Sequence, residues 1–176
     1  MIGVLAFHGG FAEHILTLRR AGFESCEVRT LEDLSRVDGL IIPGGESTVI
    51  WKFLEKTGMG EAICKRAKDL HFQIYGTCAG MIVLAKNWLG LIDISVERNA
   101  YGRQVASFIT DLEIDGRILP VGHFIRAPKI TRVGEEVEVL ASYAGVPVFV
   151  RQGNIWASSF HPELSCDTSI HEMIFS

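Results

Sequence analysis

The chain has 176 residues, of which 48% are hydrophobic and 22% are charged, and its formal net charge is −4. This length fits one domain with a sizeable core. The composition is too apolar for an intrinsically disordered chain. Its mild acidity argues against a dedicated nucleic-acid-binding protein, which needs a basic surface to neutralise phosphates.

The four cysteines, Cys26, Cys64, Cys78 and Cys166, are scattered along the chain. None has the Cys-x-x-Cys spacing of a zinc or redox site, so we expect no metal. The N-terminal segment lacks the basic region of a signal peptide, and no run of about 18 apolar residues predicts a membrane span. We therefore expect a cytoplasmic protein, because that compartment keeps thiols reduced.

The first half of the chain alternates strand and helix patterns. Short apolar runs predict buried parallel strands, and apolar residues at every third or fourth position predict helices. In chain order we expect a strand at 2–7, a helix at 11–21, a strand at 26–29, a short helix at 31–37, a strand at 38–42, helices at 47–56 and 60–70, a strand at 72–75 and a helix at 79–86. This alternation predicts a parallel sheet covered on both faces.

The second half is dominated by patterns typical of strands. They lie at 92–97, 105–114, 118–125, 137–142, 146–150 and 155–160, and a closing helix is expected at 168–175. Turn sequences at 115–116, 144–145 and 153–154 predict hairpins. The expected fold is one α/β domain over residues 1–176, a three-layer α/β/α arrangement around an open, mostly parallel sheet with antiparallel hairpin additions.

The segment Gly76-Thr77-Cys78-Ala79-Gly80 lies between a predicted strand and a predicted helix. It has the pattern of a nucleophile elbow, a sharp turn that lifts the nucleophile above the sheet. The helix N-terminus would offer the sulfur a partial positive charge, and the Ala79 N–H would face a developing oxyanion. The alternative is a buried structural cysteine in a tight turn.

Two further loops follow predicted strands. His161-Pro162-Glu163 offers an imidazole that a carboxylate can orient, as a general base requires; the alternative is a surface turn. Pro43-Gly44-Gly45-Glu46-Ser47 has glycine N–H groups that can complete an oxyanion hole; the alternative is an ordinary loop in which Ser47 caps the next helix. Because sites form at the carboxyl ends of parallel strands, the three segments together predict acyl transfer by a cysteine.

Five segments carry a resemblance to the triad glutamine amidotransferases, and among these to the glutaminase subunits of pyridoxal 5′-phosphate synthase. They are residues 43–48, 76–80, 96–104, 124–128 and 159–164, and the resemblance spans nearly the whole chain. The first, second and last are shared broadly by amidotransferases. The other two resemble the vitamin B6 branch specifically.

The resemblance implies roles for individual residues. Cys78 would attack the side-chain amide of glutamine, His161 would act as general base and then as acid, and Glu163 would orient His161. The oxyanion hole would use the N–H groups of Gly45 and Ala79. The residues implied to bind glutamine are Gly45, Glu46, Ser47, Arg103, Ile125 and Arg126, and a guanidinium suits the α-carboxylate of glutamine.

The implied reaction is hydrolysis of L-glutamine to L-glutamate and ammonia through a glutamyl thioester, with no cofactor. The ammonia would pass to a separate synthase subunit, a TIM barrel that builds pyridoxal 5′-phosphate. Docking of that subunit would bring the Gly44-Gly45 loop into its working conformation. We expect no nucleic-acid or membrane partner.

Three alternatives stay open from the sequence. The chain could serve a different synthase, such as one that makes an imidazole ring or a purine, although the segments around Arg103 and Arg126 argue against this. It could be a catalytically silent regulatory subunit, although the intact Cys78, His161 and Glu163 argue against that. The third alternative is that the chain is a stand-alone thiol hydrolase.

One residue departs from the family pattern. The chain has His8 in its first loop, where the family usually has glutamine. We hypothesise that His8 keeps a hydrogen-bonding role and adds a titratable group beside the active site.

Overall fold

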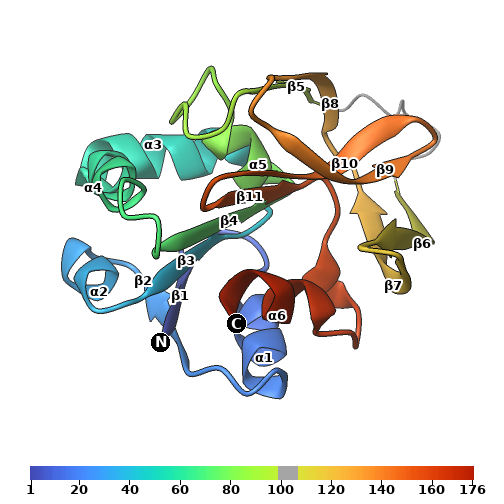
Figure 1. The fold of residues 1–176 in the computed structure, drawn as a ribbon. Helices are drawn as coiled ribbons and strands as arrows, with labels where there is room; N and C mark the ends of the chain where they lie inside the picture. Colours follow the sequence, from blue (N-terminus) through green and yellow to red (C-terminus); the bar gives the residue numbers. More distant parts are fainter. Residues whose placement is uncertain (99–106) are drawn as a thin grey trace.

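The computed structural model describes residues 1–98 and 107–176. A seven-stranded sheet in the order β2-β1-β3-β4-β11-β10-β9 forms its centre (Figure 1). The strands are β1 (Ile2–Leu5), β2 (Ser25–Val28), β3 (Gly39–Ile42), β4 (Gln73–Thr77), β9 (Glu138–Tyr143), β10 (Val146–Gln152) and β11 (Ile155–Ser158). Strands β2, β1, β3, β4 and β11 are parallel, and β10 and β9 are antiparallel additions.

Helices cover both faces of this sheet. They are α1 (Phe11–Arg20), α2 (Leu31–Ser35), α3 (Ser47–Thr57), α4 (Met59–Arg66), α5 (Ala79–Leu84) and α6 (Ser169–Phe175), with a 3-10 helix, η1 (Pro162–Leu164). Helices α3, α4 and α5 lie on one face, and α1 and α6 lie on the other (Figure 1). The predicted three-layer, mostly parallel α/β fold is confirmed.

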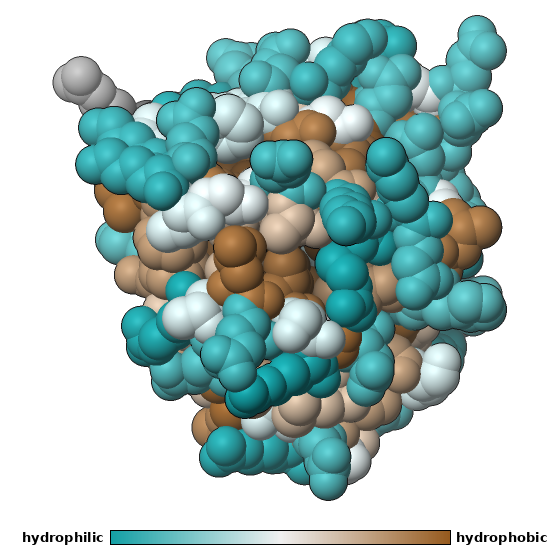
Figure 2. Space-filling view, turned by 90° about the vertical axis from the view of Figure 1, so that its left-hand side faces the viewer, coloured by the Kyte–Doolittle hydropathy of each residue, from teal (hydrophilic) through white to brown (hydrophobic). Residues whose placement is uncertain are grey.

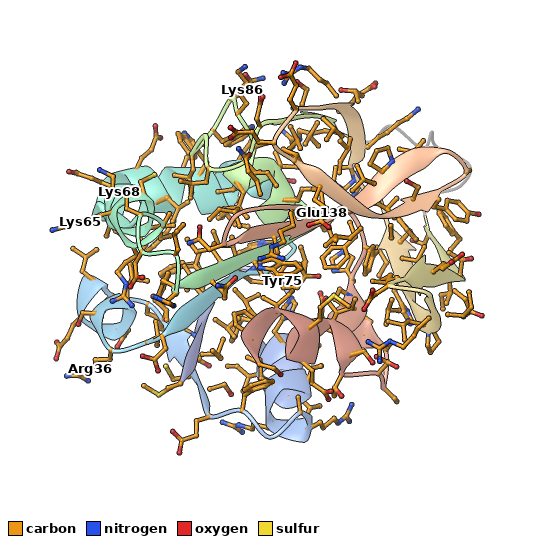
Figure 3. The ribbon with its side chains drawn as sticks, in the orientation of Figure 1. Arg36, Lys65, Lys68, Tyr75, Lys86 and Glu138 are labelled. Atoms are coloured by element: carbon orange, nitrogen blue, oxygen red, sulfur yellow. The ribbon has the colours of Figure 1, made fainter. Side chains whose placement is uncertain are left out.

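The pleat of the sheet divides the core in two. Leu40 and Ile74 pack toward α3–α5, whereas their neighbours Ile41 and Tyr75 pack toward α1 and α6. Successive side chains of a strand point to opposite faces, so strands that are apolar throughout serve both cores. Figure 3 shows Tyr75 in the interior near α6, while Arg36, Lys65, Lys68 and Lys86 point outward.

One expected hairpin, around Asp115-Gly116, and the expected strand at 92–97 do not join the central sheet. In the described residues, β6 (Ser107–Ile114) pairs with β7 (Arg117–Ile125), and β5 (Ile94–Glu97) pairs with β8 (Lys129–Val133), each as a separate two-stranded sheet. Much of β6 alternates between exposed and covered positions, so it buries chiefly one face, unlike the fully buried β1 and β3. The sequence did not predict β8, because its charged residues interrupt any apolar run.

All three predicted hairpin turns are confirmed, since β6 pairs with β7, β9 with β10 and β10 with β11. Asp115 and Gly116 have φ angles of 52° and 69° between β6 and β7, and Ala144 and Gly145 have 48° and 76° between β9 and β10. Two consecutive positive φ angles are typical of the type I′ turn that matches the twist of a hairpin.

One predicted helix is shorter than expected. Helix α4 ends at Arg66, although the periodicity predicts a helix to Leu70. The side-chain amide of Asn154 donates to the carbonyls of Ala67, Asp69 and Phe72 at 2.8–3.1 Å. These contacts hold the segment as a turn, because its carbonyls bond a residue far along the chain.

Polar residues cover most of the face shown in Figure 2, and apolar side chains gather near its middle. Among the described residues, none of the helices has the length and apolar character needed to cross a membrane.

Candidate active site

Three neighbouring strands bring the predicted segments together. In the central sheet β4 lies between β3 and β11, and Gly76 pairs with Ile42 while Thr77 pairs with Ser158. The segment 43–47 follows β3, Cys78 follows β4, and 161–163 follows β11. All three segments therefore meet at the carboxyl edge of the sheet, as predicted.

Cys78 occupies a strained turn between β4 and α5. Its φ is 50° and its ψ is −104°, in a region that L-residues rarely adopt and that costs about 1–3 kcal/mol. Its N–H donates to the Ser158 carbonyl at 2.8 Å. A Cβ on Gly80 would lie 1.9 Å from the Ile42 carbonyl oxygen, so only glycine lets α5 begin this close to β3.

His161 lies between Cys78 and Glu163. Its Nδ1–H donates to Glu163 Oε1 at 2.7 Å, which directs the other ring nitrogen away from the carboxylate. Burial opposes protonation of His161, but hydrogen bonds with Cys78 and Glu163 and their negative charge raise its pKa to about 10. Burial by itself would raise the pKa of Glu163, but the neighbouring His14 and His161 lower it below its usual range. The arrangement favours a protonated imidazole beside the sulfur.

The loop after β3 is anchored at two points. The Gly44 N–H donates to Thr77 Oγ1 at 3.0 Å, and the Glu46 N–H donates to His8 Nδ1 at 3.3 Å. His8 therefore has a hydrogen bond with this loop, in agreement with the hypothesis that it keeps a hydrogen-bonding role. The bond requires His8 Nδ1 to be unprotonated.

Ser47 does not cap α3. The N-cap of α3 is Glu46 and makes no side-chain capping bond. Ser47 is buried, and its Oγ has no hydrogen-bond partner among the described residues. A buried hydroxyl without a partner at a pocket wall is suited to a ligand.

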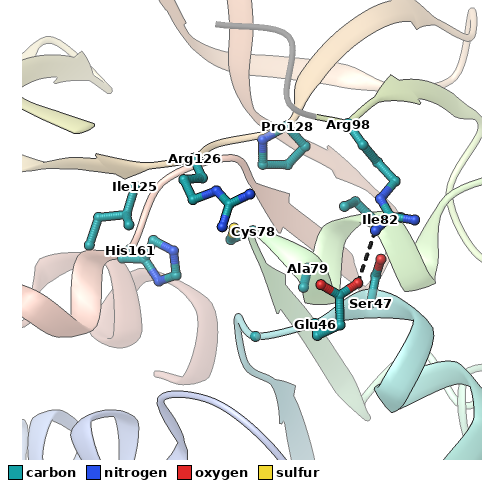
Figure 4. Close-up of a pocket in the computed structure, with 11 residues that line it drawn as sticks. Glu46, Ser47, Cys78, Ala79, Ile82, Arg98, Ile125, Arg126, Pro128 and His161 are labelled. Carbon is teal, nitrogen blue, oxygen red and sulfur yellow. Dashed lines mark hydrogen bonds and ion pairs between the residues drawn. The ribbon is translucent and has the colours of Figure 1, made fainter. Parts of the chain in front are cut away.

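A pocket of about 270 Å³ opens beside Cys78 (Figure 4). This volume is slightly below the range of about 300–1,000 Å³ common for ligand sites, so it suits a small molecule. Its lining residues are Gly45, Glu46, Ser47, Cys78, Ala79, Ile82, Arg98, Ile125, Arg126, Pro128 and His161.

Most predicted site residues therefore share one pocket. Glu163 lies behind His161, and Arg103 lies outside the described residues. Within the part of the chain that the structure describes, no cluster of His, Cys, Asp and Glu side chains could hold a metal ion.

Sequence reasoning assigned no role to Arg98. Its guanidinium forms an ion pair with Glu46 at 2.9 Å, which joins the residue after β5 to the N-cap of α3 at one wall of the pocket (Figure 4). Ile82 and Pro128 were also missed. Arg98 and Pro128 lie in the segments 96–104 and 124–128 that carried the resemblance, which is the signal that could have found them.

The chain is similar over nearly its whole length to proteins of a known family. A model of the SNO glutamine amidotransferase family matches residues 4–175. Pyridoxal 5′-phosphate synthase subunit PdxT of Pseudothermotoga lettingae is 52% identical over 180 residues, covering 97% of this chain and 92% of the relative. A subunit of the same name from Thermus thermophilus is 49% identical over 179 residues, covering 97% of this chain and 94% of the relative.

Solved structures give the same result. A protein described as a glutamine amidotransferase superposes with a TM-score of 0.90 at 46% identity, covering 98% of this chain and 96% of the other. The structure of PurLQS from Thermotoga maritima shares the fold at 18% identity, with a TM-score of 0.75 and coverage of 98% and 96%. The resemblance seen in the sequence is confirmed, and the chain belongs to the SNO glutamine amidotransferase family.

Proposed function

We propose that this protein hydrolyses L-glutamine to L-glutamate and ammonia, and that a separate synthase subunit uses the ammonia to make pyridoxal 5′-phosphate. The observation that carries the proposal is the strained Cys78 beside His161, whose Nδ1–H donates to Glu163. This is the constellation of a thiol nucleophile with an oriented base.

The first half of the reaction follows from these positions. With the proton on His161, the Cys78 sulfur attacks the side-chain carbonyl carbon of glutamine, and the carbonyl electron pair moves to oxygen. The N–H groups of Gly45 and Ala79 are proposed to stabilise this oxyanion, because both residues line the pocket. The intermediate collapses to a glutamyl thioester as His161 gives its proton to the departing ammonia.

Water completes the cycle. His161, now neutral, accepts a proton from water while the water oxygen attacks the thioester carbonyl. The carbon–sulfur bond breaks, glutamate leaves, and the sulfur and the protonated His161 are restored. Glu163 stays ionised throughout and stabilises the imidazolium.

The pocket offers groups for the α-amino-acid end of glutamine. Arg126 provides a guanidinium for the α-carboxylate, and the buried Ser47 hydroxyl offers a free hydrogen-bonding group. Glu46 provides a carboxylate that could meet the α-ammonium group, and Ile125 an apolar wall. Arg103 is proposed as a second carboxylate ligand from the resemblance alone.

The proposal of a synthase partner is based on the relatives of this chain. Both relatives named above are subunits of a pyridoxal 5′-phosphate synthase, and we propose that the synthase subunit bound by this chain is a TIM barrel. We further propose that residues 1–176 act as one glutaminase domain, in the cytoplasm.

The test is ammonia release from glutamine, measured with and without a synthase subunit. We expect release that increases on adding the subunit and that Cys78→Ala abolishes. Cys166→Ala is the matched control, because that thiol is exposed and outside the pocket, and it should behave as wild type. Partner-independent release would indicate a stand-alone hydrolase, partner binding without release would indicate a silent regulatory subunit, and either result would overturn the proposal.

A further inference from the structure

Behind the active site, two histidines form a buried pair. His14 comes from α1 and His171 from α6, and both side chains are fully excluded from solvent. His14 Nδ1 lies 2.9 Å from His171 Nε2. Burial lowers the pKa of each histidine and outweighs the opposing charge of Glu163, so both rings are neutral near pH 7.

The other nitrogen of His14 faces the active site. His14 Nε2 lies 3.2 Å from Thr77 Oγ1 and 3.4 Å from Glu163 Oε2. Glu163 Oε1 meanwhile accepts from His161. Among the residues that the structure describes, Glu163 Oε2 makes no hydrogen bond of ordinary geometry, so the His14 ring is the polar group that faces this oxygen.

Thr77 connects the same nitrogen to the oxyanion loop. Its Oγ1 accepts the Gly44 N–H at 3.0 Å, and Gly44 precedes Gly45, the proposed oxyanion donor. A single imidazole nitrogen is therefore within reach of the carboxylate that orients His161 and of the hydroxyl that anchors the loop.

The surroundings select one tautomer of His14. If Nε2 carried no proton, its lone pair would face the Glu163 carboxylate, which is an acceptor only. Nδ1–H would then donate to His171, whose own Nδ1–H would be a buried donor without a partner, since His171 Nδ1 has none among the described residues. An unpaired buried donor destabilises the folded protein. Within the described part of the chain, His171 Nδ1 lacks a partner in either tautomer, as a donor in one and as an acceptor in the other. The Glu163 carboxylate therefore selects the tautomer, because only a proton on Nε2 lets His14 face it as a donor.

We propose that His14 is a positioning residue for the glutaminase reaction: its Nε2–H, held in place by His171, fixes Glu163 and Thr77 together. This inference rests on the proposed function. By holding Oε2, His14 keeps Oε1 directed at His161, and through Thr77 it keeps Gly44 beside the nucleophile. The orientation of the general base and the position of the oxyanion loop are thereby coupled.

Two conservative variants separate the contacts of His14. In His14→Gln the amide nitrogen can take the place of Nε2 and donate to Glu163 and Thr77. In His14→Asn the shorter side chain keeps polar atoms near His171 but cannot reach Glu163. Thr17→Val is the matched control, because Thr17 is buried on the same helix and its hydroxyl donates only to the Glu13 carbonyl in the described residues.

The variants are assayed for ammonia release in the complex with the synthase subunit. We expect His14→Asn to lower kcat by about 10- to 100-fold, the usual effect of removing a group that orients a reactive side chain, with KM within about twofold of wild type. His14→Gln should restore most of kcat, and Thr17→Val should keep it. Equal kcat for His14→Asn and wild type, or equal losses in His14→Asn and His14→Gln, would overturn the positioning role.

The tautomer of His14 can be measured in the wild-type protein, so this test does not depend on whether a variant folds. Imidazole ¹⁵N chemical shifts of the wild-type protein, assigned through one- and two-bond couplings, should show a proton on Nε2 and a bare Nδ1 for His14. A proton on Nδ1 would overturn the proposal. If the wild-type complex releases no ammonia, the proposed function fails as well; normal turnover with the wrong tautomer refutes only the role of His14.

Discussion

The imidazole of His161 packs against the backbone of Gly44 so closely that a Cβ at residue 44 would lie 2.4 Å from His161 Cε1 and 3.3 Å from Cys78 Cβ. Gly44→Ala should therefore displace the His161 ring and lower kcat by about 100-fold or more, because a misplaced base loses its alignment. Ammonia release and thermal unfolding should be measured together.

Gly60→Ala is the control for that substitution. Gly60 lies in α4, and a Cβ there would make ordinary contacts of 3.4 Å or longer with Leu54 and Leu89. It should keep full activity and gain about 0.5–1 kcal/mol of stability, as alanine does in a helix. Wild-type activity in Gly44→Ala would show that His161 can move without loss.

Glu163→Gln tests the carboxylate of the triad. The change keeps the size of the side chain but leaves an amide where a charge stabilised the imidazolium, so kcat should drop by about 10³–10⁴-fold with little change in KM. Single-turnover ammonia release would measure the loss at the acylation step. A decrease of only a few-fold would indicate that Glu163 has a structural role alone.

Arg98 and Glu46 form an ion pair that is partly open to solvent. An exposed pair of this kind contributes at most about 1 kcal/mol to stability, so Arg98→Gln should fold normally. We expect KM for glutamine to rise about tenfold with kcat nearly unchanged, since the pair shapes the pocket wall without touching the reacting bond.

Glu46→Gln provides the second arm of that test. If the two side chains act on glutamine as a unit, the double variant should be no worse than the poorer single variant. Additive effects would indicate that Arg98 and Glu46 contact the substrate separately.

His8 carries a prediction about acid sensitivity. Protonation would convert His8 Nδ1 from the acceptor of the Glu46 N–H into a donor, and the loop would lose that anchor. His8→Gln should match wild type at neutral pH and keep more activity at acidic pH, whereas His8→Leu should be impaired at every pH. An unchanged pH profile of the docked enzyme in His8→Gln would refute the idea.

His171 predicts a loss of stability in acid. Burial, and secondarily the charge of His14, lower the pKa of His171 to about 3, while in the unfolded chain a histidine titrates near about 6.5. Between these values the unfolded state binds the extra proton, so the free energy of unfolding falls as pH drops from about 6.5 toward about 3, by at most about 1.4 kcal/mol per pH unit.

His171→Gln isolates this contribution. The amide can still donate to His14 Nδ1 but does not titrate, so urea unfolding should show a flatter pH dependence below about pH 6.5. A slope equal to that of wild type would assign the acid sensitivity to other groups. His14 is the first of these, because burial lowers its pKa as well.

Local patterns predicted much of this protein. Continuous apolar runs predicted β1 and β3, and the glycines around Cys78 predicted the nucleophile elbow, because each feature is encoded within a few residues. The resemblance, now confirmed, supplied the family and its reaction. The β6–β7 hairpin was expected on the central sheet but forms a separate sheet, and β8, the partner of β5, was not predicted. Which strands join a sheet depends on the burial of both faces.

What escaped prediction depends on contacts between distant segments. His14 lies on the buried face of an ordinary amphipathic helix. Its proposed role depends on its contact with Glu163, which is 149 positions later in the chain. The early end of α4 depends on Asn154, which pattern reasoning cannot connect to residues 67–72. Such roles arise only when the chain is folded.

The pairing of β4 with β11 has a consequence for how this protein can change. Cys78 and His161 both follow strands whose backbones are joined residue by residue, with Thr77 opposite Ser158. The separation of sulfur and imidazole is thus set mainly by main-chain hydrogen bonds, and far less by the apolar side chains around them. Substitutions that repack either core should alter stability but preserve the spacing of nucleophile and base. The core sequence can therefore vary among related proteins while the geometry of Cys78 and His161 stays the same.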